Sequence, residues 1–103
     1  MSILLEFSMF PLDQGESLSE HVGGLIKLIR ESGVDYHLTA MGTIVETERL
    51  DRALALVEQC NELLQRQGCK RIFASIKLDI RNGSMGRLQG KIRAIERRIG
   101  AVK

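Results

Sequence analysis

The spacing of hydrophobic residues changes several times along the chain, and each change marks an expected element. The longest unbroken period-two stretch runs from Arg71 to Arg81 and predicts an extended strand. Its apolar side consists of Ile72, Ala74, Ile76, Leu78 and Ile80. Its other side carries Phe73, Ser75, Lys77 and Asp79. We therefore expect one face of this strand to join a core and the other to meet water or a binding partner.

Three more strands are expected earlier in the chain. The alternation from Ile3 to Phe10 predicts a first strand that Pro11 stops, because proline has no N–H group to give to a β ladder. Two short runs rich in strand formers, Tyr36 to Ala40 and Thr43 to Thr47, flank Met41-Gly42. Because glycine takes positive φ easily, Met41-Gly42 is expected to form the tight turn of a hairpin.

Apolar residues at helical spacing predict a helix from about Leu18 to Glu31. Ser17 and Glu20 have the spacing of a capping box at its start, and Gly33 is expected to end it. Its apolar stripe is Leu18, Val22, Leu25, Ile26 and Ile29.

Two further helices are predicted. Thr47 is expected to cap the second helix, and Gly68 to close it. The last helix follows the turn Asn82-Gly83-Ser84, and its polar side is basic. The shared face of the second helix is Leu50, Ala53, Leu54, Val57, Cys60 and Leu64, and the apolar stripe of the last is Leu88, Ile92, Ile95 and Ile99.

This order of elements predicts an α+β protein with a ferredoxin-like βαββαβ fold and one added C-terminal helix, a single domain over residues 1–103. In such a fold two helices cover one face of a four-stranded antiparallel sheet, and the other face is open. The open face would show Glu6, Ser8 and Phe10 of the first strand beside Phe73, Ser75, Lys77 and Asp79 of the last. Because this mixture is more apolar than water favours, we expect a second subunit, a ligand or both to cover it.

Composition narrows the class of protein further. The 103 residues are 44% hydrophobic and 27% charged, which is typical of one globular domain. A net charge of +2 is too small to attract nucleic acid or a membrane at long range, and no apolar run approaches the roughly 18 residues of a membrane span. The first residues lack the pattern of a secretory signal. Cys60 and Cys69 fit neither a disulfide framework nor a metal knuckle, so we expect reduced thiols in a cytoplasmic protein.

Several segments in order resemble the small thiamine-binding-protein family, over about nine tenths of the chain. They are Glu6-Phe7-Ser8 with Pro11-Leu12, Tyr36-x-Leu38-Thr39-x-Met41-Gly42-Thr43-Ile44-Val45-Glu46, Arg71-Ile72 leading to Asp79-Ile80-Arg81, and Lys91-Ile92. The resemblance implies a ferredoxin-like subunit that forms dimers or dimers of dimers. It also implies binding of thiamine or its pyrimidine moiety without catalysis, as a carrier, buffer or sensor.

Carried over from the family, Ser8, Thr43 and Glu46 are the first candidates for ligand contacts. An aminopyrimidine has an amine donor and ring-nitrogen acceptors, so Glu46 or Glu6 can accept hydrogen bonds while Thr43 or Ser8 donates them. Phe10 or Phe73 can supply a flat apolar wall, and a carboxylate suits the positive thiazolium ring. Alternatively, Thr43 is only a strand former, and Ser8 and Glu46 only face water.

Other functions receive less support from the residues. An acylphosphatase-like enzyme needs a basic phosphate cradle after the first strand, but the loop from Pro11 to Glu16 contains acidic residues and no basic one. The histidines, His21 and His37, have no metal-ligand spacing with the cysteines. RNA-recognition domains stack bases on aromatic residues of the third strand, which Thr43 to Thr47 lacks. The main rival is an oligomeric structural protein with no small ligand, whose open face is buried by self-association.

Overall fold

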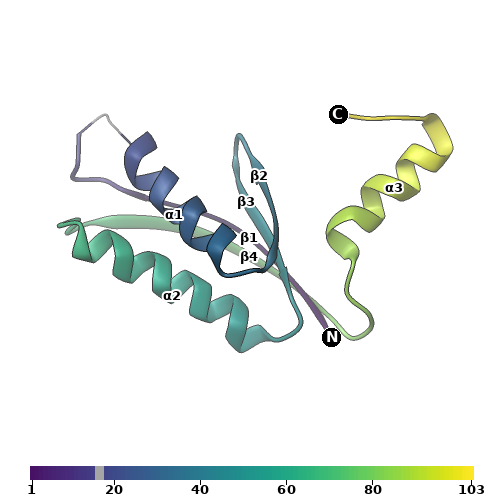
Figure 1. The fold of residues 1–103 in the computed structure, drawn as a ribbon, viewed down its shortest axis with the longest axis horizontal. Helices are drawn as coiled ribbons and strands as arrows, with labels where there is room; N and C mark the ends of the chain where they lie inside the picture. The colour runs from purple at the N-terminus through teal and green to yellow at the C-terminus, as the bar shows by residue number, and fades with distance from the viewer. Residues whose placement is uncertain (16–17) are drawn as a thin grey trace.

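The computed structural model describes residues 1–15 and 18–103 and has the order of elements expected from the sequence. The elements are β1 (Ser2–Pro11), α1 (Ser19–Glu31), β2 (Asp35–Thr39), β3 (Gly42–Thr47), α2 (Leu50–Arg66), β4 (Ile72–Arg81) and α3 (Arg87–Ile99). All neighbouring strands are antiparallel, in the order β2-β3-β1-β4. This is the ferredoxin-like α+β arrangement that the sequence predicts. In Figure 1, α1 and α2 lie side by side over the sheet, and α3 projects away from it.

The core lies between the sheet and the two helices. Alternate residues of the central strand β1 point into it, and Ile3 and Leu5 are completely buried. Val45 of β3 pairs with Leu5, so it faces the same way. From the helices the core receives Leu25, Ile29, Ala53, Leu56, Cys60 and Leu64. The period-two pattern of Ile3 to Phe10 and the buried position of Cys60 are therefore confirmed.

The strand β4 differs from its expected burial. Its apolar row pairs in register with the core row of β1, so it faces the helix side as predicted. However, β4 is an edge strand, and only Ile72 is partly buried against the core. Ile76, Leu78 and Ile80 stay exposed. The expectation that this whole row joins the core is wrong, because neither α1 nor α2 extends over the outer edge of the sheet.

The start of α2 lacks the capping side chain expected from the sequence. The helix α2 begins at Leu50, with Arg49 as its N-cap and no side-chain capping bond, so the prediction that Thr47 caps it is wrong. Thr47 instead ends β3, and its buried hydroxyl donates to the Arg49 carbonyl oxygen at 2.8 Å. The capping box of α1 depends on Ser17, which lies outside the described residues, as does Glu16 of the acidic loop.

The hairpin between β2 and β3 has a turn that requires glycine. A Cβ atom on Gly42 would lie 3.1 Å from the carbonyl oxygen of Phe7 in β1. The Thr39 hydroxyl donates to the Gly42 carbonyl oxygen and accepts a hydrogen bond from the Met41 N–H, at 2.8 and 3.1 Å. The hairpin tip is therefore held close against the central strand.

Candidate functional site

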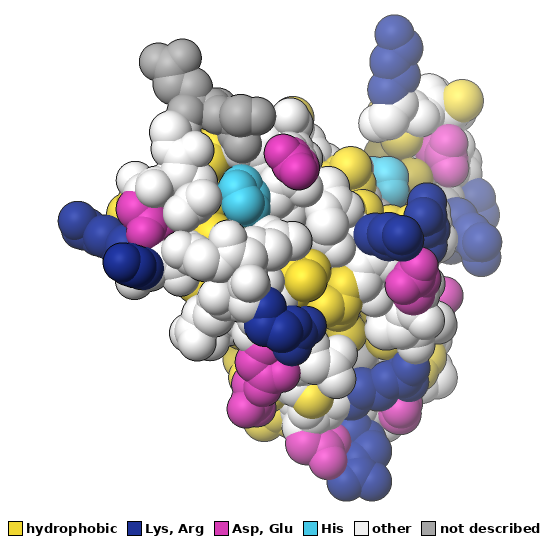
Figure 2. Space-filling model, turned by 60° about the vertical axis from the view of Figure 1, so that its left-hand side comes forward, with side chains coloured by type: hydrophobic (Ala, Val, Ile, Leu, Met, Phe, Trp, Pro, Cys, Tyr) yellow, Lys and Arg dark blue, Asp and Glu magenta, His cyan; other side chains and the backbone are white. Residues whose placement is uncertain are grey.

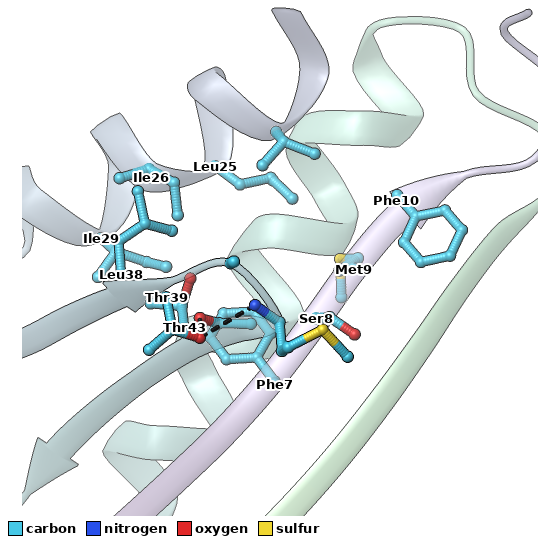
Figure 3. Close-up of a pocket in the computed structure, with 14 residues that line it drawn as sticks. Phe7, Ser8, Met9, Phe10, Leu25, Ile26, Ile29, Leu38, Thr39 and Thr43 are labelled. Carbon is cyan, nitrogen blue, oxygen red and sulfur yellow. Dashed lines mark hydrogen bonds between the residues drawn. The ribbon is translucent and has the colours of Figure 1, made fainter. Parts of the chain in front are cut away.

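A cleft of about 400 Å³ lies where the hairpin tip, the second half of β1 and the inner side of α1 meet. In Figure 3, Leu25, Ile26 and Ile29 of α1 point toward β1 and the hairpin, while Phe7, Met9 and Phe10 come from β1. None of the described residues that line the cleft has a charged side chain. The cleft has the size of a small-molecule site and the mainly apolar lining that such sites share.

Three hydroxyl residues line the cleft, and the hydroxyl of one of them, Thr39, is already bonded within the hairpin turn. Ser8 and Thr43 line the cleft from neighbouring strands, and neither hydroxyl has a hydrogen-bond partner within the described residues. Thr43 as a whole is only 5% exposed. Among the described residues, however, every side-chain nitrogen or oxygen that is fully shielded from solvent has a hydrogen-bond partner, so the unpartnered Thr43 hydroxyl is not fully shielded. The Thr43 hydroxyl is therefore open to the cleft. Each hydroxyl can donate one hydrogen bond and accept others from a bound molecule.

Phe10 forms one wall of the cleft and is supported from β4. Phe10 and Phe73 are paired in register, with ring centroids 5.5 Å apart and an interplanar angle of 38°. Such tilted aromatic pairs are favourable and hold both rings in place. Phe73 does not itself line the cleft, so of the two rings proposed from the sequence only Phe10 belongs to the lining.

Glu46 does not line the cleft, and its side chain points to the other face of the sheet from Thr43. Its carboxylate is buried on the side of the sheet opposite α1 and α2, where it accepts four hydrogen bonds. The donors are the Ser2 hydroxyl at 2.6 Å and the N–H groups of Gly86, Arg87 and Leu88 at 3.0, 3.1 and 3.2 Å. Glu46 thus caps the start of α3, a position that favours a negative charge.

These bonds set the ionisation of Glu46. Burial alone would raise its pKa, but the hydrogen bonds from Ser2 and the three N–H groups lower the pKa below its usual value of 4.5. At neutral pH Glu46 is therefore a carboxylate whose acceptor positions are occupied within the chain.

Glu6, the second carboxylate proposed from the sequence, lies on the open face of the sheet. It is half-exposed and forms an ion pair with Lys77 at 3.7 Å. It is not among the residues that line the cleft. Ser8, Thr43 and Phe10 all belong to the cleft lining, whereas Glu6, Glu46 and Phe73 do not. The register places the Thr43 side chain on the helix side of the sheet, and those of Ser8 and Phe10, which alternate with the buried Phe7 and Met9, on the opposite side.

Sequence reasoning missed most of the cleft lining. Leu25 and Ile29 carry the helical spacing that indicates a core, and they are indeed buried, but they also form the floor of the cleft. A usable signal was present at the hairpin, where Leu38 and Met41 are large apolar residues next to a turn. Both are exposed, and both line the cleft.

A cysteine and a histidine approach each other elsewhere, at the ends of α1 and α2. The Cys69 thiol lies 4.0 Å from Nδ1 of His21, and this nitrogen is also 2.8 Å from the Gln67 side-chain oxygen. Burial, with the Asp13 carboxylate nearby, raises the pKa of Cys69. A thiol in this state is a poor nucleophile. In residues 1–15 and 18–103, no group of three or more His, Cys, Asp or Glu is placed to hold a metal ion.

Comparison with known proteins identifies the family of this chain. The family model described as thiamine-binding protein matches residues 5–96, so the chain belongs to the thiamine-binding protein family. A UPF0045 protein of Mycobacterium tuberculosis is 33% identical over 97 residues, covering 94% of each chain. A UPF0045 protein of Methanothermobacter thermautotrophicus is 28% identical, covering 94% of this chain and 99% of the relative.

Solved structures show the same architecture. A hypothetical protein from Methanocaldococcus jannaschii has a TM-score of 0.79 at 26% identity, covering 91% of this chain and 95% of the other. A proposed thiamine biosynthesis/salvage protein from Thermotoga maritima has a TM-score of 0.78 at 20% identity, with 92% and 99% coverage. The resemblance expected from the sequence is confirmed at the level of family and fold.

Proposed function

We propose that this protein binds thiamine or a related hydroxymethylpyrimidine compound in the cleft beside α1. Membership of the thiamine-binding family gives the class of ligand. The observation that carries the proposal is the apolar cleft with the available Thr43 hydroxyl on its helix side and with Ser8 and Phe10 also in its lining. An aminopyrimidine ring is flat and can both donate and accept hydrogen bonds, so it matches these groups.

The lining also determines which part of thiamine enters. Burying a charge without a partner is costly, and the described lining of the cleft offers no carboxylate to the positive thiazolium ring. In the proposed binding mode the neutral aminopyrimidine therefore lies inside, and the thiazolium stays at the mouth in contact with water. Phosphate groups attached to the thiazolium side would likewise remain outside.

A binding role without catalysis fits the chemistry of the site. No titratable side chain lines the cleft among the described residues, so acid–base or nucleophilic catalysis has no group to use there. The protein would then act as a carrier, buffer or sensor of its ligand. The two unpaired, buried cysteines fit a reducing compartment, which supports a cytoplasmic location. No helix in the described part of the chain has the length and hydropathy that a membrane span needs.

The family resemblance also leads us to expect a homo-oligomer, either a dimer or a dimer of dimers. The exposed rows of β4 and α3 supply apolar surface for such assembly. Self-association without a ligand remains the competing function, and it would be favoured if the folded protein bound no thiamine.

Isothermal titration with thiamine, hydroxymethylpyrimidine and the isolated thiazolium alcohol tests the proposal. We expect binding of the first two compounds and little or none of the third. Thr43→Val and Ser8→Ala should each weaken binding about two- to tenfold, since each removes one hydrogen bond. Ser75→Ala is the matched control, because Ser75 pairs with Ser8 in register but does not line the cleft. Unchanged dissociation constants in both cleft variants, or no binding by the folded parent protein, would contradict the proposal.

A further inference from the structure

The hairpin of β2 and β3 is shorter than the strand beside it, and this leaves a gap in the sheet. β1 pairs with β4 along its whole length, from Ser2 to Pro11. Its pairing with β3 ends at Phe7, which lies opposite Thr43. Figure 3 shows β1 continuing past the hairpin turn toward Phe10. Beyond Phe7, the edge of β1 on the hairpin side therefore has no neighbouring strand among the described residues, and this part of β1 lines the cleft.

The main-chain groups of Met9 point into this gap. Successive residues of a strand direct their N–H and C=O groups alternately to the two neighbouring strands. The Leu12 N–H donates to the Arg71 carbonyl oxygen at 2.8 Å, so it faces β4. The Phe7 carbonyl oxygen faces β3, since a Cβ atom on Gly42 would lie 3.1 Å from it. Even-numbered residues in this part of β1 thus face β4, and the odd-numbered Met9 faces the side where β3 has ended.

Met9 offers a buried donor and acceptor that no described residue uses. Within residues 1–15 and 18–103, no hydrogen bond reaches its main-chain N–H or C=O, although Met9 is only 6% exposed. Buried main-chain groups without a partner are rare, because they lose their bonds to water. On either side along this edge, Phe7 is paired with Thr43 and Pro11 has no N–H group. The free edge is therefore one residue long, which is too short for another strand and suits a small molecule. The opposite, charged side of the molecule in Figure 2 has no comparable feature in our argument and is not used.

We infer that the main chain of Met9 recognises the ligand as a neighbouring strand would, a role that rests on the function proposed above. The Met9 N–H donates to the ring nitrogen next to the amine of an aminopyrimidine, and the Met9 carbonyl oxygen accepts from that amine. The second ring nitrogen lies across the ring and takes no part. The ring then lies about in the plane of the sheet, with Thr43 on the helix side and with Ser8 and Phe10 on the other.

This arrangement makes the cleft selective for the amine. A ring with oxygen in place of the amine carries a hydrogen on the neighbouring nitrogen, so its donor and acceptor are exchanged. The Met9 N–H would then face a donor, and the Met9 carbonyl oxygen would face an acceptor. The hydroxyls of Ser8 and Thr43 can turn to donate or accept, but a main-chain N–H and C=O cannot exchange roles. Selectivity for the amine therefore separates main-chain recognition from recognition by the hydroxyls alone.

Isothermal titration with thiamine and with its oxo analogue, in which oxygen replaces the pyrimidine amine, tests the inference without changing the protein. We expect the oxo analogue to bind about tenfold or more weakly, because it leaves the buried Met9 groups without partners. Equal affinity for the two compounds would overturn the role of Met9 and leave thiamine binding itself intact. If the folded protein bound neither compound, the proposed function would fail together with this inference.

A second test removes the donor. Met9→Pro has no N–H at this position, whereas Met9→Val loses a similar part of the side chain and keeps the N–H. We expect Met9→Pro to bind thiamine about tenfold or more weakly than Met9→Val. Because the Met9 N–H has no partner in the free protein, both variants should keep the circular dichroism spectrum of the parent. Equal dissociation constants for the two folded variants would overturn the inference.

NMR of the parent protein gives a result even if Met9→Pro does not fold. With thiamine labelled with ¹⁵N beside the amine, we expect a scalar coupling across the hydrogen bond between that nitrogen and the Met9 amide nitrogen. The amides of Ser8 and Phe10 face β4 and serve as internal controls without such a coupling. A coupling to another amide, or none at saturation with thiamine, would contradict the role of Met9.

Discussion

The carboxylate of Glu46 connects three segments that are distant in the sequence. It accepts the Ser2 hydroxyl from the start of β1 and three N–H groups from the start of α3, while its own backbone belongs to β3. From the sequence, a carboxylate on a strand next to a hairpin was a reasonable ligand candidate. The segment that uses it begins 40 residues later at Gly86, and no local pattern indicates that contact. Its identification as a helix cap therefore required the tertiary structure.

Replacing Glu46 with Gln should loosen α3 without unfolding the sheet. Hydrogen bonds to a charged group contribute about 1.5–3 kcal/mol, so amide exchange in α3 should become roughly ten- to a hundredfold faster. Exchange in β1 and β3 should change far less, because their ladder and core contacts are retained. Hydrogen–deuterium exchange followed by mass spectrometry would measure both. Equal protection of α3 in the parent and the variant would contradict the capping role.

The same residue predicts a dependence on pH. Because the pKa of Glu46 is lower in the folded state than its usual 4.5, the carboxylate stabilises the fold fully above that value. This contribution is lost as the pH falls below about 4.5 and through the folded-state pKa. We expect urea unfolding curves to show a loss of stability between pH 5 and about pH 3 that is smaller in Glu46→Gln. Parallel pH profiles for the two proteins would exclude this cause.

At the scale of elements, local patterns determined which segments become strands and helices, and neighbouring segments determined what each one buries. The alternation in β1 predicted its buried side correctly because β1 is central and its inner row is covered by helices. The equally regular alternation in β4 did not, because an edge strand can face the core side and still lie outside it. Strand order, which periodicity does not contain, separates the two cases.

The hairpin shows the same limit for the candidate site. Its turn was predicted at Met41-Gly42, and the structure places Gly42 as the first residue of β3, after a turn at Ala40-Met41. The register within the hairpin could not be obtained from the sequence. Thr43 and Glu46 therefore looked like joint ligands, although the register points Thr43 toward the helices and Glu46 to the opposite face.

Gly42→Ala tests how closely the hairpin tip must approach β1. The added Cβ would lie 3.1 Å from the Phe7 carbonyl oxygen, and the φ of +155° is also rare for other residues. We expect a loss of about 1–3 kcal/mol in the free energy of unfolding by urea. Gly23→Ala is the control, because its Cβ would meet nothing within 4 Å and alanine favours the helix. Equal stabilities of the Gly42→Ala and parent proteins would show that the tip can move away from β1.

In the whole molecule, the apolar cleft lies apart from the exposed apolar residues of β4 and α3. The cleft lies under α1 and the hairpin tip, while the exposed Ile76, Leu78 and Ile80 of β4 are at the opposite edge of the sheet and α3 projects away from the body. A ligand in the cleft would therefore not contact the exposed apolar residues of β4 or α3. That residues 1–103 behave as one domain stays a prediction from length and composition.

An amide NMR titration with thiamine is the most direct test of the cleft as the ligand site. We expect saturable shifts in residues 7–10, in residues 39–43 and in the inner side of α1. The amide signals of Lys77 to Arg81 and of α3 should not shift, because these residues belong to surfaces that the ligand does not contact. Saturable shifts confined to the open face of the sheet or to α3 would contradict the assignment of the site, and the absence of any shift in the folded protein would contradict thiamine binding itself.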